Sequence, residues 1–212
     1  EKQLPLVPSA IGIWALLDKD APTAANAALM SSDFGLPDGY FGPSITRDLK
    51  TGAFSWGPLD LSLENGFKTW FLDPLAKGRP ALVGPYLYQG SLYTSATAVI
   101  HDASGKGVGL AGVDFNGGVF NDLIGATKPL GTGWIGVINA DGNWVVHSDA
   151  SLLGKPADDA SSRDAIAGAQ AGAYHATTPV AGENWRVISR QVALTQYGID
   201  WTVMVAVPES TL

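Results

Sequence analysis

Three glycines in the segment GKGVGLAGVDF, residues 105 to 115, have the spacing of a nucleotide-binding loop. Gly107, Gly109 and Gly112 read G-x-G-x-x-G, the pattern with which a backbone cradles a pyrophosphate. Such a loop must lie between a strand and the N-terminus of a helix, where free amide groups meet the phosphates. Here the polar turn HDASGKG precedes the glycines, and alternating apolar residues place them inside the returning strand of a hairpin. We therefore reject a nucleotide site and expect the glycines to mark a bulge or a close approach of backbone or ligand.

No other spacing in the chain is typical of a catalytic or metal centre. The histidines, His101, His147 and His175, share no H-x-x-x-H spacing, and the absence of cysteine excludes thiolate catalysis and cysteine-ligated zinc. Asp158 and Asp159 precede a predicted helix, where acidic residues favour the helix N-terminus. No nucleophile elbow, Walker loop or zinc-protease motif is present. We expect no enzymatic activity, no metal and no cofactor.

The composition limits the class of partner. The 212 residues, 46% hydrophobic and 16% charged, suffice for one large domain or two small ones. A formal net charge of −7 and scattered basic residues argue against nucleic acid, because no basic patch could offset phosphate charge. The chain has no apolar run of about 18 residues, so we expect no segment of it to span a membrane.

The predicted elements have the order of an α+β protein made of two similar halves. Strands are predicted where apolar and polar residues alternate, and helices where alanine-rich or proline-interrupted segments lack that alternation. In chain order we expect a helix ending near residue 18, a strand at 25–32, a hairpin around 48–56, a helix at 64–78, strands at 81–88, 91–101 and 107–115, a helix at 117–126, a hairpin at 133–149, a helix at 160–170, and strands at 172–180, 184–193 and 199–207.

Two pairs of segments resemble each other along the chain. GYFGPSITRDLKTGAFSW is similar to GWIGVINADGNWVVHSD, and YTSATAV is similar to YHATTPV, each before a final antiparallel strand. Such repetition indicates two copies of one α+β module, each an antiparallel sheet flanked by helices. The boundary is expected near residues 127–131.

The hairpin that carries the three glycines resembles that of a known family. A strand, D-x-S-G-K, G-x-x-G-V-D and a short helix are similar to the double Cache (dCache) sensor domains, which are extracytoplasmic ligand-binding domains of bacterial chemoreceptors, sensor histidine kinases and cyclases. The ordered segments WFLDPLAKGRPALVGPYLYQG and GTGWIGVINADGNWVVHSDASLLGK extend this resemblance over most of the chain. It implies two PAS-like modules, a membrane-distal ligand-binding one at residues 20–126 and a membrane-proximal one at 127–212. Residues 1–19 would be the remnant of a mostly truncated N-terminal helix.

The resemblance also implies a set of ligand-binding residues. In the amino-acid-binding version of the family, an Arg-x-Trp pair holds the ligand carboxylate, and a tyrosine and the aspartate of G-V-D hold the ammonium group. Trp70, Tyr86 and Asp114 stand at the matching positions, while Lys68 replaces the arginine and Leu63 an upstream tyrosine. Lysine lacks the planar fork that binds a carboxylate through two hydrogen bonds, so a small amine fits at least as well as an amino acid. Further candidates for the pocket are Tyr88, Tyr93 and Trp56.

Each candidate has an alternative structural role. Asp114 could cap a helix beginning near Gly117, and Trp70 could belong to the core. Lys68 could be a solvated surface residue. Strand alternation points about half of the aromatic side chains away from any one pocket.

The resemblance implies sensing as the function. The chain would be the periplasmic or extracellular part of an inner-membrane receptor, binding a small amine or amino-acid-like solute, with the membrane-anchored parent protein forming a homodimer. One alternative is a sensor with a degenerate pocket that recognises a carboxylate or a partner protein. Another is a soluble solute-binding protein or an extracellular enzyme of the same fold class.

Overall fold

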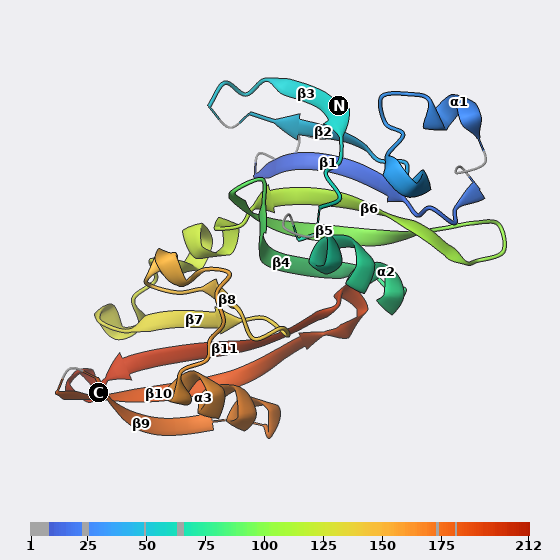
Figure 1. Ribbon diagram of the computed structural model, residues 1–212. Helices are drawn as coiled ribbons and strands as arrows, with labels where there is room; N and C mark the ends of the chain where they lie inside the picture. The colour runs from blue at the N-terminus through green and yellow to red at the C-terminus, as the bar shows by residue number, and fades with distance from the viewer. Residues whose placement is uncertain (1–8, 23–25, 49, 63–65, 173, 181) are drawn as a thin grey trace. The chain divides into compact units, whose positions relative to one another are not determined.

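Two compact units, residues 1–116 and 117–212, make up the chain in the computed structural model (Figure 1). Each unit is built on one antiparallel sheet. No helix in the part of the chain that is described has the length and apolarity needed to cross a membrane. The structure describes residues 9–22, 26–48, 50–62, 66–172, 174–180 and 182–212.

The first unit contains a six-stranded sheet in the order β3-β2-β1-β6-β5-β4. Every neighbouring pair is antiparallel, and the strands predicted in the second half of this unit are confirmed. The strands are β1 (Ala10–Leu17), β2 (Pro43–Arg47), β3 (Phe54–Pro58), β4 (Ala81–Tyr88), β5 (Ser91–His101) and β6 (Gly107–Asn116).

The first strand corrects the prediction of a helix ending near residue 18. Ala10–Leu17 forms β1, which lies inside the sheet between β2 and β6. A strand covered on both faces reads as a continuous apolar run, and periodicity alone does not distinguish such a run from a buried helix. The remnant helix was predicted for residues 1–19, of which 1–8 lie outside the described residues.

The predicted strand at 25–32 is also wrong over its described part. Ala27–Met30 forms the short helix α1, and the side chain of Asn26 accepts the amide protons of Ala28 and Leu29 at 3.1 and 3.2 Å. Asparagine is a favourable N-cap, and alanine, leucine and methionine are good helix formers. Local capping therefore decides this segment.

The helix predicted at 64–78 is confirmed over its described residues from Lys68 onward. A wide helical turn, Lys68–Leu72, continues into α2 (Asp73–Lys77), which ends at Gly78 with a φ of 63°. The segment covers one face of the first sheet (Figure 1). Its Trp70 and Phe71 are fully buried in the core of the first unit.

The glycines of the false nucleotide pattern lie in β6, as predicted, and serve packing. A Cβ at Gly112 would lie 2.3 Å from the indole of Trp14, and one at Gly109 would lie 2.3 Å from the carbonyl oxygen of Leu16. Because β1 pairs with β6, only glycine allows the Trp14 ring to lie flat against the neighbouring strand. This packing places the indole beside Asp114.

The second unit contains a five-stranded sheet in the order β8-β7-β11-β10-β9. Helix α3 (Ala160–Gln170) packs on one face, and the Ser189 hydroxyl of β10 donates a 2.8 Å hydrogen bond to the carbonyl of Ala165. The hairpin and the later strands predicted for this half are confirmed. The strands are β7 (Trp134–Ile138), β8 (Trp144–Val146), β9 (Tyr174–Val180), β10 (Glu183–Leu194) and β11 (Ile199–Pro208).

A helical turn at Asn121–Gly125 confirms the helix predicted at 117–126 and belongs to the second unit. The side chain of Asn121 accepts the backbone amide of His147, which follows β8, at 3.0 Å. This hydrogen bond fixes the turn against the end of β8.

Candidate functional site

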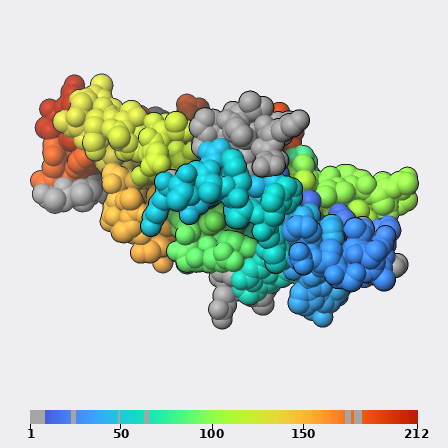
Figure 2. Space-filling view, turned by 90° about the horizontal axis from the view of Figure 1, so that it is seen from above, coloured from blue at the N-terminus to red at the C-terminus, as the bar shows by residue number. Residues whose placement is uncertain are grey.

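A cavity of about 350 Å³ in the first unit opens beside Asp114. It is lined by residues of the β2–β3 hairpin, by Trp14 of β1 and by residues at the ends of β4, β5 and β6. In the space-filling view this hairpin, in light blue and cyan, lies on the face turned to the viewer (Figure 2). The side chains that matter most for its chemistry are those of Trp14, Arg47, Trp56, Tyr88, Tyr93 and Asp114.

Asp114 is held by two donors that meet on one of its oxygens. The indole Nε1 of Trp14 donates to Oδ1 at 2.7 Å, and the hydroxyl of Ser95 donates to the same atom at 2.6 Å. Because Ser95 gives its proton to Asp114, it accepts the hydroxyl proton of Tyr86, at 2.6 Å. Both hydrogen bonds between Asp114 and the described residues thus end on Oδ1, and Oδ2 keeps its capacity to accept from a ligand.

The backbone beside Oδ2 carries no side chain. A Cβ at Gly12 would lie 3.2 Å from Oδ2 of Asp114, closer than ordinary van der Waals contact. Glycine at this place in β1 therefore leaves room around the oxygen. Asp114 as a whole residue is only 8% exposed, so any charged group that binds Oδ2 does so largely shielded from water.

Burial raises the pKa of Asp114 above its ordinary value, and the hydrogen bonds from Ser95 and Trp14 offset only part of this effect. An ionised carboxylate that is poorly solvated gains most from a cation placed next to it. The site is therefore suited to a ligand with a positive charge.

Two tyrosines form the aromatic part of the wall. The rings of Tyr88 and Tyr93 are 5.4 Å apart in an edge-to-face arrangement, and the Tyr88 hydroxyl accepts the backbone amide of Asp60 at 2.9 Å. Burial, followed by nearby carboxylates that include Asp114, raises the pKa of both phenols. They stay neutral at physiological pH and present polarisable ring faces, which attract cations. Trp56 is 60% exposed and forms the rim.

Trp70 and Tyr86 are not among the described residues that line this cavity. Trp70 is 1% exposed and packs edge-on against Trp14, with ring centroids 5.1 Å apart. Tyr86 is 9% exposed and reaches Asp114 through Ser95; burial and the charge of Asp114 raise the pKa of its phenol. Trp70 therefore packs against Trp14, and Tyr86 hydrogen-bonds to Ser95, so each contacts a residue that donates to the Asp114 carboxylate.

Lys68 is not among the described cavity-lining residues either. Its ammonium group pairs with the carboxylate of Asp73 at 2.7 Å, and both side chains are largely exposed. Among the described residues that line the cavity, the cation is Arg47 at the end of β2, whose guanidinium lies 5.4 Å from the centre of the Phe54 ring. Arginine can bind a carboxylate through two parallel hydrogen bonds, which lysine cannot.

Trp14, Ser95 and Arg47 are the residues that sequence reasoning missed. Trp14 fell in a segment predicted to be helical, so its position opposite Gly112 was not foreseen. Alternation in the predicted strand 91–101 would have placed Ser95 on the same face as Tyr93. The predicted hairpin could have located Arg47, because Arg47 pairs with Phe54 across its turn.

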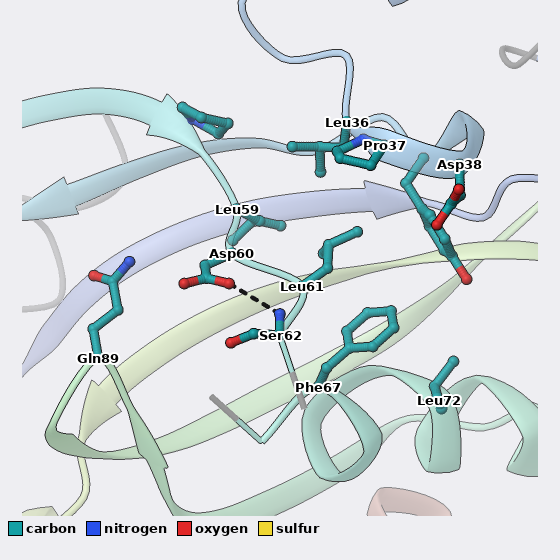
Figure 3. A pocket seen from close by; sticks show the side chains of 12 residues that line it. Leu36, Pro37, Asp38, Leu59, Asp60, Leu61, Ser62, Phe67, Leu72 and Gln89 are labelled. Carbon is teal, nitrogen blue, oxygen red and sulfur yellow. Dashed lines mark hydrogen bonds between the residues drawn. The ribbon is translucent and has the colours of Figure 1, made fainter. Parts of the chain in front are cut away.

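A second, more apolar cavity of about 770 Å³ lies next to the first (Figure 3). The two share Pro58, Leu59 and Gln89 in their walls. Figure 3 shows Leu61 and Phe67 facing the same space, with the Asp60 carboxylate accepting the amide of Ser62 at 2.9 Å. Its acidic side chains, Asp38 and Asp60, are not buried. It is therefore suited to the apolar part of a ligand.

No group of three or more histidine and acidic side chains that could hold a metal ion is found among the described residues.

The fold defined by these two sheets is that of extracellular sensor domains. No protein-family profile and no curated protein sequence matches the chain. Among solved structures, methyl-accepting chemotaxis protein X is similar over 98% of this chain and 78% of its own, with a TM-score of 0.78 and 22% identity. The extracellular domain of a protein described as a histidine kinase, mmHK1S-Z3, is similar over 99% and 77%, with a TM-score of 0.76 and 21% identity.

A third similar structure was solved with its ligand. The ligand-binding domain of the Pseudomonas fluorescens chemoreceptor CtaA, in complex with L-leucine, matches 93% of this chain and 71% of its own, with a TM-score of 0.58 and 17% identity. The chain therefore has the double Cache fold that its sequence predicts, with two PAS-like sheets.

Proposed function

We propose that this chain is the extracytoplasmic sensory domain of a bacterial transmembrane signalling receptor. It binds a small amine or an amino-acid-like solute in the cavity beside Asp114, in what would be the membrane-distal module. The observation that carries this proposal is the buried Asp114, which lines a cavity with aromatic side chains and accepts its hydrogen bonds from the described residues through Oδ1 alone. The likeness of the fold to chemoreceptor and histidine kinase sensor domains supports it.

The residue chemistry supports a ligand with an ammonium group. A carboxylate that accepts from a charged donor contributes about 1.5–3 kcal/mol, and aromatic faces add about 0.5–2 kcal/mol. Tyr88 and Tyr93 supply those faces in the same cavity as Asp114. No enzymatic step is part of the proposal.

Arg47 supports an acidic group at the other end of the ligand. It lines the cavity from β2, while Asp114 lines it from β6, two strands away in the same sheet. A zwitterion could place its ammonium group on Asp114 and its carboxylate on Arg47. This assignment replaces the carboxylate role first considered for Lys68, which is paired with Asp73.

Signalling would follow from a ligand that prefers one conformation of the domain. Asp114 lies two residues before the end of β6 at Asn116, the last residue of the first unit. A ligand that bridges Asp114 and the β2–β3 hairpin stabilises the conformation in which both contact it, by its difference in affinity for the two states. The parent receptor would be membrane-anchored and homodimeric, with this domain in the periplasm or outside the cell.

A thermal-shift screen of the chain against amino acids, amines, small carboxylates and purines tests the proposal. A ligand at a hundred times its Kd adds about 2.7 kcal/mol, which is several degrees for a protein of this size. We expect an amine or amino acid to raise the Tm, and the Asp114→Asn variant to lose that rise.

The matched control is Asp38→Asn, which neutralises an acid of the neighbouring cavity at a position with a φ of 61° that asparagine tolerates. This variant should keep the response. The proposal fails if no amine shifts the Tm, or if Asp114→Asn responds as the native chain does. A response restricted to carboxylates without an amine would favour a degenerate site that recognises acids.

A further inference from the structure

A separate cavity of about 190 Å³ lies in the second unit, on the face of the sheet that α3 covers. The residues that line it come from β7, β8, β10 and β11, from His147 after β8 and from the start of α3; these strands are neighbours in one sheet (Figure 1). Three of its lining side chains are tryptophans: Trp134 of β7, Trp144 of β8 and Trp185 of β10. The function proposed above uses none of them.

A glycine of β7, Gly136, leaves space for two of these indole rings. A Cβ at Gly136 would lie 2.7 Å from Cζ3 of Trp134 and 2.8 Å from Cζ3 of Trp144. Glycine at this position therefore lets both indoles pack closely over β7. Trp144 is 4% exposed, while Trp134 and Trp185 are half-buried. One ring of the cavity, that of Trp144, is therefore buried, and those of Trp134 and Trp185 remain partly accessible.

His147 adds a fourth ring to this group. Its centroid is 4.7 Å from that of Trp144 and 5.6 Å from that of Trp134. Its Nδ1 accepts the backbone amide of Asp149 at 2.9 Å, so the proton of the neutral imidazole is on Nε2. The ring is thereby held in one orientation beside the indoles.

Asp159 is the one carboxylate among the described residues that line this cavity. It caps α3 and accepts from both the backbone amide and the hydroxyl of Ser162. Partial burial raises the pKa of Asp159, but the hydrogen bonds from Ser162 outweigh it and the net shift is downward. The carboxylate is therefore ionised at neutral pH. Asp159 is exposed and Trp144 is buried, so the negative charge of this cavity is nearer to solvent than the Trp144 ring.

We propose that this cavity is a second ligand site, which binds a small alkylated ammonium ion. Aromatic faces attract organic cations, and cages of such rings are the recurrent means of holding quaternary ammonium groups. Asp159 supplies the complementary charge and would repel an anion. A hydrated metal ion would lose water without gaining oxygen ligands among three indoles. The volume equals that of about six water molecules at ~30 Å³ each, which limits the ligand to a few heavy atoms.

This site differs in chemistry from the one in the first unit. At Asp114 the ligand must donate a hydrogen bond to Oδ2, which requires an N–H or O–H group and excludes tetramethylammonium. At the tryptophan cavity the attraction is to the face of a ring, so a cation without N–H groups is accepted. Tetramethylammonium and choline are therefore suitable probes, and 3,3-dimethylbutan-1-ol is the neutral molecule of the same shape as choline.

The experiment titrates the chain with tetramethylammonium, choline and the neutral alcohol, following tryptophan fluorescence and Tm. We expect saturable binding of both cations at millimolar concentrations and at least tenfold weaker binding of the alcohol. Asp159→Asn should weaken binding about tenfold or more while keeping the helix cap, because asparagine caps as well as aspartate. Trp185→Leu should abolish the fluorescence response, with its Tm without ligand checking that the variant is folded.

Asp114→Asn is the control that separates the two sites. It should leave binding of tetramethylammonium unchanged, whatever it does to amines in the first unit. The proposal is overturned if neither cation binds, if the alcohol binds as well as choline, or if Asp159→Asn has no effect. It is also overturned if Asp114→Asn removes the response, because the cation then occupies the first unit.

Discussion

Trp14 and Asp114, one hundred residues apart in the chain, are joined by a 2.7 Å hydrogen bond between the indole Nε1 and the carboxylate Oδ1. The bond links β1 to β6 and, with the one from Ser95, ends on Oδ1 of a carboxylate that lines the cavity. Ser95 completes the arrangement from β5. Three adjacent strands thus fix one carboxylate, and the following predictions depend on that arrangement.

Replacing Asp114 with asparagine should stabilise the free protein at neutral pH. The pKa of Asp114 is raised in the folded state by burial, so its stabilising contribution is complete below the unfolded value near 4 and is lost as the pH rises through the folded value. Asparagine keeps an acceptor for Trp14 and Ser95 without a charge. Each kcal/mol gained corresponds to roughly 2–4 °C. Measuring the Tm of both forms without ligand from pH 4 to 8 should show a difference that grows with pH. A difference that shrinks with pH would contradict the raised pKa.

Binding of an amine to the first unit should weaken as the pH falls. The cation binds the ionised carboxylate, and a proton competes for the same group below the raised pKa of Asp114. Well below that pKa the affinity should drop about tenfold per pH unit. Isothermal titration between pH 5 and 8, with an amine that stays protonated throughout, measures this dependence. An affinity that stays constant over the pH range in which Asp114 itself becomes protonated would show that Asp114 does not hold the ligand.

Gly112→Ala should destabilise the first unit and loosen the ligand site. The new methyl would lie 2.3 Å from the Trp14 indole, which must move and release Asp114. Overpacking of this kind typically costs about 1–3 kcal/mol. Gly57→Ala is the matched control, because a Cβ there meets nothing within 4 Å. Urea unfolding followed by tryptophan fluorescence compares the two. Equal stabilities would mean that the indole has another place to lie.

Arg47→Gln should discriminate between an amino acid and the amine that lacks its carboxylate. If Arg47 binds the carboxylate, the variant loses a charge-assisted interaction of about 1.5–3 kcal/mol, or roughly 10–150-fold in Kd. The affinity for the amine alone should stay the same. Lys68→Gln should change neither affinity, because Lys68 is paired with Asp73 on the surface. A loss of affinity for the amino acid in Lys68→Gln alone would mean that Lys68, and not Arg47, binds the carboxylate.

Elements with clear local patterns could be predicted from the sequence. The hairpin of β5 and β6, the β7–β8 hairpin with its Asp141-Gly142 turn, and α3 with its Asp159 cap all follow from alternation, turn residues and capping. The helical predictions at 64–78 in the first unit and at 117–126 in the second also hold over their described residues.

The first strand could not be predicted because its local pattern was ambiguous. An apolar run such as Ala10–Leu17 fits a buried helix and a central strand equally, and only its pairing with β2 and β6 decides between them. The strand predicted at 25–32 is wrong because Asn26 caps the helix formers that follow it, and this cap favours a helix.

The sequence by itself determined the fold class, the two antiparallel modules and Asp114 as the central candidate. Tertiary structure alone decided which partners that carboxylate has, because hydrogen bonds and cavity walls join residues from different strands. Trp14 and Ser95 approach Asp114 from β1 and β5, and Arg47 reaches the cavity from β2, while Lys68 stays with Asp73. Local propensities specify strands and turns within a few residues, whereas register and packing between distant strands set the chemistry of a site.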